Sequence, residues 1–354
     1  MAATHGHAGS EALAGTSTWF AGGTGFDWVY ILLASTLIGG LFLDGWAHTH
    51  GKVDQSFFTP WHAVLYSGFA LVAAFLVLTL VMNHTQGTAW RNAFPAGYGS
   101  AVIGAAVFAV GGVGDLIWHT LFGIEKGIEG TISPSHLTLA LGALLMFSGP
   151  LRAAWRKTAP DASARWVTLL PPLLALTSIL SLLTFFTQYA NPIVTSRADV
   201  EFNPDGLNET LGAVSITLQA AITMGVVLFA IRRWPGLPLG TFAILFGLNG
   251  FLMSFLAGSS PVLEVGILSA LIGLLADLLN RALRPSAEAV LMLRIFAFAV
   301  PFINYVIYFA ALLLLKGTIA WSVHVWTGTI VETGIVGLLL SYLCVPPRMP
   351  GKAT

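Results

Sequence analysis

Residues 60–82 read PWHAVLYSGFALVAAFLVLTLVM, a stretch without a single Lys, Arg, Asp or Glu. An apolar run of about 20 residues is long enough to cross a bilayer as a helix. Similar runs recur along the chain, and their continuous rather than alternating hydrophobicity argues against a β-barrel. The sequence therefore predicts an all-α, polytopic membrane bundle of about ten transmembrane helices. The expected spans are residues 28–48, 60–82, 97–121, 134–150, 166–189, 209–231, 239–257, 262–280, 289–315 and 320–345.

The composition excludes several other classes of protein. Hydrophobic residues make up 56% of the chain and charged residues only 9%, whereas soluble domains have about 25% charged residues. The 16 basic and 16 acidic residues balance, and no basic stripe is visible, which excludes a nucleic-acid partner. Cys344 is the only cysteine, so no disulfide can form within the chain. The first residues lack the basic start of a secretory signal peptide, and residues 1–27 are expected to form an N-terminal tail.

The Lys and Arg residues predict the orientation of the bundle. If the N-terminus is cytoplasmic, twelve of them fall on the inside. Only Lys52, Lys126, Arg197 and Lys316 then fall on the outside. Because positive residues favour the cytoplasmic side, we expect both termini to be cytoplasmic and the 190–208 loop to be periplasmic. The expected location is a bacterial inner (plasma) membrane.

A duplicated motif lies within the first four predicted spans. Each copy has the form Asp-x-x-x-His at the end of one span, a loop, and then [Ser/Thr]-Pro-x-His at the start of the next. Because the copies lie two spans apart, they share one orientation. This favours a parallel repeat of two helical hairpins related by a pseudo-twofold axis along the membrane normal. The first copy comprises Asp44, His48, Thr59, Pro60 and His62, and the second comprises Asp115, His119, Ser133, Pro134 and His136.

The spacing within each copy predicts a metal centre at one end of the bundle. Residues four apart share a helix face, and a Ser or Thr cap followed by Pro begins the next helix. Each later histidine should therefore lie at the depth of the preceding Asp/His pair. Ionisable groups at membrane depth are costly unless they are paired or coordinated, although helix capping at the interface is the alternative role. The expected ligands of one dinuclear or two separate metals are Asp44, His48, His62, Asp115, His119 and His136.

Other acidic and histidine side chains near the predicted metal-binding end of the bundle are weaker candidates for site residues. Glu125 and Glu129 lie four apart in the second loop. Each is a candidate for a carboxylate that bridges two metal ions or that contacts the metal ligands from outside. A solvated loop face is the alternative for both. Near the starts of later spans, Glu264 and His324, with Glu332 deeper in the last one, are candidates for a polar vestibule or a proton relay. A buried structural acid is an equal alternative for Glu332.

The pattern Asp44-x-x-x-His48 followed by His62 resembles the metal site of the C subunit of copper membrane monooxygenases. That family oxidises methane, ammonia or short alkanes. The resemblance implies that Asp44, His48 and His62 form one metal set. It covers only this short stretch, and the chain departs from the family in spacing, in its larger number of spans and in the duplication of the motif. The whole chain looks like a bacterial polytopic membrane-protein family that carries the duplicated motif.

Two functional hypotheses follow from these ligands. The first is a metalloenzyme with a periplasm-facing centre that oxidises a small apolar substrate held in a hydrophobic cavity below. Imidazole and carboxylate suit copper, which we favour, then iron, with zinc as a further candidate.

The second hypothesis is a transition-metal (copper) transport or handling protein that uses the same cluster to capture ions. A transporter should carry ligands along a path through the membrane. Here the ligands gather at one end, which favours the enzyme. A structural or assembly role without metal is disfavoured by the duplicated motif.

Both hypotheses predict the same organisation of the chain. Residues 28–150 form a metal-binding four-helix repeat region, and residues 151–354 form a further six-helix transmembrane region. The expected partners are the lipid bilayer, the apolar substrate or metal ion, and an electron donor or a second copy of the chain.

Overall fold

The computed structural model describes residues 19–52, 57–125, 127–156, 166–198, 206–234, 236–258 and 262–347. Within these ranges the chain forms helices and connecting segments and contains no strand. In chain order the helices are η1 (Trp19–Ala21), α1 (Thr24–Thr49), α2 (Pro60–Thr85), η2 (Trp90–Asn92), α3 (Gly99–Phe122), α4 (Glu129–Ile132), α5 (Pro134–Arg156), α6 (Trp166–Phe186), η3 (Gln188–Ala190), α7 (Leu207–Arg233), α8 (Thr241–Ala257), α9 (Val262–Leu283), α10 (Val290–Lys316) and α11 (Val323–Cys344).

The predicted polytopic helical bundle is confirmed by the described helices. Nine helices in this part of the chain are long and apolar enough to cross a membrane. Helix α8 is apolar but has only 17 residues, so it is about 25 Å long and shorter than the hydrocarbon core. Each predicted span corresponds to one of α1–α3 and α5–α11. The four-residue helix α4 is an addition that no apolar run signals.

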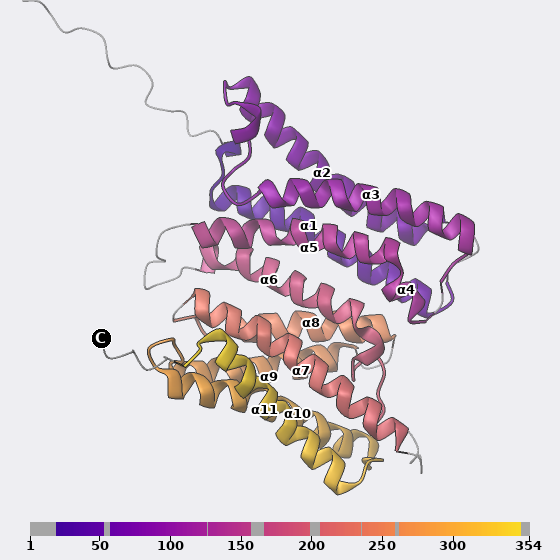
Figure 1. Ribbon diagram of the computed structural model, residues 1–354, viewed down its shortest axis with the longest axis vertical. Coiled ribbons are helices and arrows are strands. Elements are labelled where there is room, and N and C mark those ends of the chain that lie inside the picture. Colours follow the sequence, from indigo (N-terminus) through magenta and orange to yellow (C-terminus); the bar gives the residue numbers. More distant parts are fainter. Residues whose placement is uncertain are drawn as a thin grey trace, which may run out of the picture.

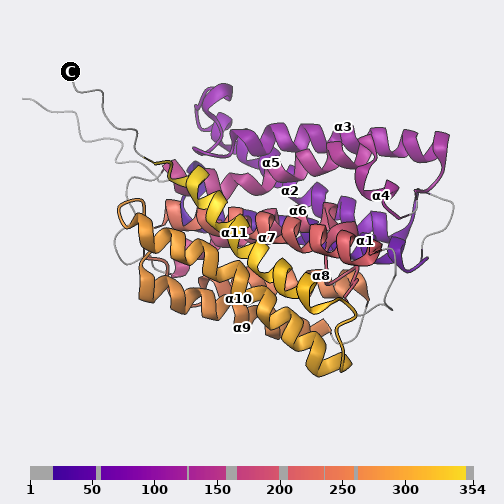
Figure 2. The same cartoon turned by 60° about the horizontal axis from the view of Figure 1, so that its bottom comes forward.

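The long helices lie side by side and run roughly parallel to one another (Figures 1 and 2). Helices α1, α2, α3 and α5 occupy one edge of the bundle, and α9, α10 and α11 occupy the other. The most closely packed neighbours are the hairpin pairs α1–α2, α3–α5, α8–α9 and α10–α11. Helix α6 contacts α1, α5 and α8, so it connects the N-terminal hairpins to the rest of the bundle.

Glycines allow the helices of the two N-terminal hairpins to approach closely. A Cβ atom at Gly68 on α2 would lie 2.7 Å from the Cα atom of Leu37 on α1. A Cβ atom at Gly142 on α5 would lie 2.6 Å from the backbone nitrogen of Phe108 on α3. Membrane helices commonly use small residues in this way, because the helices associate by close packing. This packing fixes the relative positions of the polar side chains at one end of each hairpin.

Local sequence signals set the helix ends from which the site is built. The backbone N–H of His62 donates a hydrogen bond to the Thr59 hydroxyl oxygen at 3.1 Å, and Pro60 is the first helical residue of α2. The predicted cap at the start of this helix is therefore confirmed. Helix α3 ends at Phe122, and the following Gly123 has a φ of +83° that strains any other residue. At Ser133, before α5, the hydroxyl contacts the His136 ring instead of a backbone N–H.

Candidate metal centre

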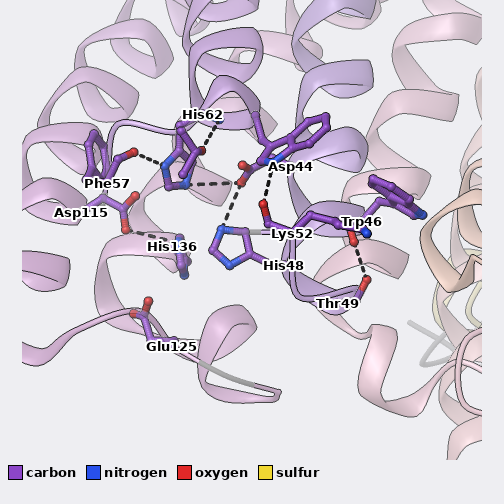
Figure 3. A network of polar contacts seen from close by, with 12 residues as sticks. Asp44, Trp46, His48, Thr49, Lys52, Phe57, His62, Asp115, Glu125 and His136 are labelled. Carbon is purple, nitrogen blue, oxygen red and sulfur yellow. Dashed lines mark hydrogen bonds and ion pairs between the residues drawn. The ribbon is translucent and has the colours of Figure 1, made fainter. Parts of the chain in front are cut away.

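Four histidines and three carboxylates converge at one end of the N-terminal hairpins (Figure 3). They come from four helices and one loop, so residues that are distant in the sequence form a single cluster. All six predicted ligands belong to it, together with one of the two loop acids. The members are Asp44 and His48 on α1, His62 on α2, Asp115 and His119 on α3, Glu125 in the following loop, and His136 on α5.

The first hairpin gathers its ligand atoms around Asp44. The Oδ2 atom of this buried carboxylate lies 3.8 Å from Nε2 of His48 and 3.5 Å from Nε2 of His62. The i,i+4 spacing on α1 accounts for the first contact. The close packing of α1 on α2 accounts for the second. The first copy of the motif therefore forms a compact set of three side chains.

The second hairpin repeats this arrangement around Asp115. The Oδ1 atom of Asp115 lies 3.4 Å from Nε2 of His119 and 3.2 Å from Nε2 of His136. Glu125 adds a second carboxylate, with Oε2 3.1 Å from Nδ1 of His119. The second set thus contains one more acid than the first.

His62 joins the two sets into one cluster. Its ligand atom lies within 4.8 Å of ligand atoms on Asp115 and His119 as well as near Asp44. The imidazole rings form a continuous row, with centroid distances of 5.5 Å from His48 to His62, 6.0 Å from His62 to His119 and 5.7 Å from His119 to His136. The two hairpins therefore present their ligands to one another.

The hydrogen bonds of the rings determine which nitrogen faces the carboxylates. Nδ1 of His62 lies 2.6 Å from the carbonyl oxygen of Phe57, and Nδ1 of His119 lies 3.2 Å from the carbonyl oxygen of Gly123. A carbonyl oxygen only accepts hydrogen bonds, so each Nδ1 carries the hydrogen. In the neutral ring, Nε2 then holds a lone pair, and that is the nitrogen directed at the Asp side chains. Nδ1 of His136 is similarly placed, 2.9 Å from the Ser133 hydroxyl.

This arrangement places lone pairs opposite carboxylate oxygens, which repel one another unless a cation or a proton lies between them. Several buried atoms of the cluster have no hydrogen-bond partner among the described residues, although buried polar atoms rarely lack one. Two ligand atoms at about 2.1 Å from a tetrahedral metal lie roughly 3.4 Å apart, close to the distances observed. The residues could therefore hold a metal ion. The unpartnered atoms are Asp44 Oδ1, Asp115 Oδ1, His119 Nε2, and Oε1 and Oε2 of Glu125.

A cavity of about 770 Å³ extends from the cluster into the bundle. Its upper wall contains the polar side chains of the cluster other than His119, together with Gln188. Its lower wall is apolar and is formed by residues such as Leu37, Ala143 and Phe147. The hydrophobic cavity expected beneath the ligands is therefore present.

The remaining predicted site residues lie outside the cluster. Glu129 is exposed on α4 and belongs to none of the metal-binding groups found among the described residues. Glu264, His324 and Glu332 are exposed and do not line the cavity. Their helices, α9 and α11, occupy the opposite edge of the bundle from α1 (Figure 1). Gln188 lines the cavity, whereas these three predicted vestibule residues do not.

Tyr66 is a neighbour of the cluster that the motif does not identify. Its hydroxyl group donates to Oδ2 of Asp115 at a long 3.5 Å, and its ring lies 6.3 Å from that of His62. The only signal for it in the sequence is its position four residues after His62 on α2. An isolated tyrosine within an apolar span ordinarily indicates a packed side chain, so this signal is weak.

Comparison with protein-family models, curated proteins and solved structures finds no match. The fold and the site define a polytopic helical membrane protein with a buried Asp/His cluster able to hold a metal ion.

Proposed function

We propose that this chain is a membrane metalloenzyme whose periplasm-facing, dinuclear Asp/His centre oxidises a small apolar substrate. The observation that carries the proposal is the orientation of the rings. Backbone carbonyls hold the Nδ1 atoms of His62 and His119, so their Nε2 lone pairs face Asp44 and Asp115. Such bonds from the far side of the ring are typical of histidines that bind metals.

The row of imidazoles provides room for two ions. One would be held by Asp44, His48 and His62. The other would be held by the second set, namely Asp115, His119, His136 and Glu125. Four imidazoles with carboxylates suit copper first and iron second, with zinc as a further candidate. The duplicated motif would in this way place one ion in each hairpin, with His62 at the boundary between them.

The bound metal would supply the activation of dioxygen. In the overall reaction, one oxygen atom enters a C–H bond of the substrate to give an alcohol. The other leaves as water after uptake of two electrons from an external donor and two protons. The residues of this chain contribute the remaining functions: the carboxylates balance the charge of the ions, and the apolar lower wall holds the substrate and excludes water.

The alternative function is transport or handling of copper or another transition metal. A second, smaller cavity of about 210 Å³ favours it, because residues including Gly23, Asp27 and Tyr98 line this cavity near the opposite end of α1. Between the two cavities, the Tyr30 hydroxyl donates to the Met146 carbonyl oxygen at 2.9 Å, and the Tyr30 ring packs 4.8 Å from that of Tyr98. This contact interrupts a path for ions and supports the enzyme over the transporter.

Metal analysis of the purified protein tests the proposal. The wild type should retain two ions per chain, and the His48→Ala/His136→Ala variant should lose them. His84→Ala is the matched control, because His84 stacks on Trp90 at the other end of α2. Unchanged metal content in the double variant would refute the metal centre. Metal loss without any dioxygen-dependent turnover or spectral change in the wild type would refute only the enzyme, and ion uptake into proteoliposomes would then support transport.

A further inference from the structure

The depth of the main cavity indicates the shape of the molecule that it accepts. On α1 its lining runs from His48 through Leu41 to Leu37, and on α5 it runs from His136 through Ala140 and Ala143 to Phe147. Each stretch covers about three helical turns, which corresponds to roughly 16 Å at 1.5 Å per residue. The cavity is therefore a shaft that descends from the cluster along the helices.

The polarity of the shaft changes along its length. The carboxylates and imidazoles line its upper part, while the part below them is lined by side chains such as Leu65, Phe108, Leu139 and Leu182. Leu37 and Phe147 lie at its deep end and are 1% and 0% exposed. At this depth the Tyr30 hydroxyl donates to the Met146 carbonyl oxygen, and both residues are 0% exposed, so the bundle is closely packed where the cavity ends. An occupant must therefore be polar at one end and apolar over the rest of its length.

We propose that the substrate is a single-tailed, lipid-like molecule whose unbranched hydrocarbon chain lies along the shaft and whose polar end lies at the cluster. A molecule as small as a short alkane would leave most of the 770 Å³ empty, and protein interiors contain few voids of that size. This inference rests on the proposed function for the chemistry at the polar end, and it replaces the small apolar substrate of that function with a longer molecule that has one polar end. The shaft itself does not depend on a metal being bound.

The surrounding lipid limits what a binding measurement can show about occupancy of the shaft. Lipid tails are as apolar as the wall of the shaft, so a chain gains little free energy by moving from lipid into it. Affinity alone therefore reports poorly on occupancy of the shaft. The position of the chain end is the better readout, because it differs between the shaft and the lipid-facing surface.

Photo-crosslinking with two alkanols measures that position. Full-length protein in lipid nanodiscs is irradiated with dodecanol or hexanol, each carrying a diazirine at its terminal carbon, and labelled peptides are identified by mass spectrometry. Dodecanol should label α1 near Leu37 and α5 near Phe147, and hexanol should label higher, near Leu41 and Ala140. Identical patterns for both probes, or labelling confined to lipid-facing residues such as the exposed Leu121 on α3, would overturn the inference.

A variant that places a large side chain in the shaft tests the same proposal. Ala143→Phe should reduce labelling near Leu37 about tenfold, because overfilling a packed apolar site is costly, while metal content stays unchanged. If that variant does not fold, Ala140→Phe, one turn below His136, serves the same purpose. Ala109→Phe is the control, since Ala109 is exposed on α3 and does not line the cavity. Equal labelling in the filled variant and the control would contradict the proposal.

The two proposals fail separately in these experiments. Deep labelling in wild-type protein that binds no metal would leave the shaft in place and refute the metal centre. Bound metal without deep labelling would refute the lipid-like substrate and leave the metal centre standing.

Discussion

At the residue scale, the ring of His136 depends on a single hydroxyl group for its orientation. The Ser133 hydroxyl oxygen lies 2.9 Å from Nδ1 of His136 and directs Nε2 towards Asp115. His62 and His119 are held instead by backbone carbonyls, which a substitution does not remove. Ser133 is therefore the side chain through which the orientation of a ligand can be tested without changing the ligand.

Ser133→Ala should weaken metal binding about 10–100-fold, the usual effect of removing a group that orients a ligand. Thr138→Ala is the matched control, because the Thr138 hydroxyl donates only to the Pro134 carbonyl oxygen of its own helix among the described contacts. Titration of the purified apoprotein with the metal measures both affinities. Equal affinities in the two variants would show that Ser133 does not orient His136.

Loss of a ligand itself should have a larger effect. Alanine at His48, His62, His119 or His136 should lower metal affinity by at least about 10–100-fold, because removal of a ligand exceeds removal of its support. Asp44→Asn and Asp115→Asn keep the size of the side chain but remove its charge, so they should also weaken binding. Metal content after dialysis is the measurement. The exposed His324 is the control, and loss of metal from His324→Ala would contradict its placement outside the cluster.

The sequence identifies most members of the cluster because the motif occurs twice, but it does not identify their environment. All six predicted ligands lie in the cluster, whereas Glu125 and Glu129, equal candidates in the sequence, separate in the structure. The loop after Gly123 brings Glu125 to His119, and the start of α4 leaves Glu129 exposed. Loop conformation, rather than the spacing of the two acids, decides between them.

At the scale of elements, apolar runs predict the helices well and their ends less well. The span predicted to end at Pro150 continues to Arg156 in α5, because a buried proline can be accommodated within a membrane helix packed against neighbours. The last span begins at Val323 rather than at residue 320, since the Ser322 hydroxyl accepts from the backbone N–H of Val325. Both differences depend on contacts that composition does not show.

A carboxylate from the next helix caps the start of helix α8. The backbone N–H groups of Gly240, Phe242 and Ala243 donate to Asp277 on α9 at 2.9, 3.0 and 3.1 Å. Asp277 is 1% exposed, and its charge also suits the positive end of the helix. This contact joins the shortest apolar helix of the bundle to its neighbour.

Asp277→Ala should lower the free energy of unfolding by about 2 kcal/mol, because buried N–H groups lose a charged acceptor. Asp277→Asn keeps one acceptor oxygen and should lose less. Thermal unfolding in detergent measures both variants. Metal content should remain at the wild-type level, because α8 supplies no ligand to the cluster. A melting temperature unchanged in Asp277→Ala would contradict the capping role.

At the scale of the whole molecule, the cluster connects two hairpins that meet at one end of the bundle. Its ligands come from α1, α2, α3 and α5, and His62 lies within ligand distance of both sets. A bound ion would therefore hold together four helices that otherwise contact one another at this end by packing and by the long Tyr66–Asp115 hydrogen bond. Metal binding and the stability of the bundle should be linked.

Removal of the metal with a chelator should lower the melting temperature of the wild type. A ligand present at a hundred times its Kd stabilises the folded state by about 2.7 kcal/mol, and chelation removes that contribution. The His48→Ala/His136→Ala variant should melt at one temperature with or without chelator. A melting temperature of the wild type that does not respond to chelator would contradict this linkage.

Reporter fusions test the predicted orientation. A reporter after Thr354 should be cytoplasmic, and one in the 190–208 loop should be periplasmic, because Lys and Arg favour the cytoplasmic ends. Residues 199–205 of that loop and the end of the chain lie outside the described residues. The opposite result would place the cluster on the cytosolic side and weaken the case for copper.

The closed floor of the shaft also has an electrical consequence. The main cavity reaches the end of the bundle that carries the exposed Thr49 and Gly51, and it stops above Tyr30. The cluster therefore shares the potential of the aqueous phase at that end, and an ion that loads there does no work against the membrane voltage. Passage beyond the floor would involve about 2.3 kcal/mol per charge for each 100 mV. Ion occupancy in proteoliposomes should consequently remain constant when a voltage is imposed.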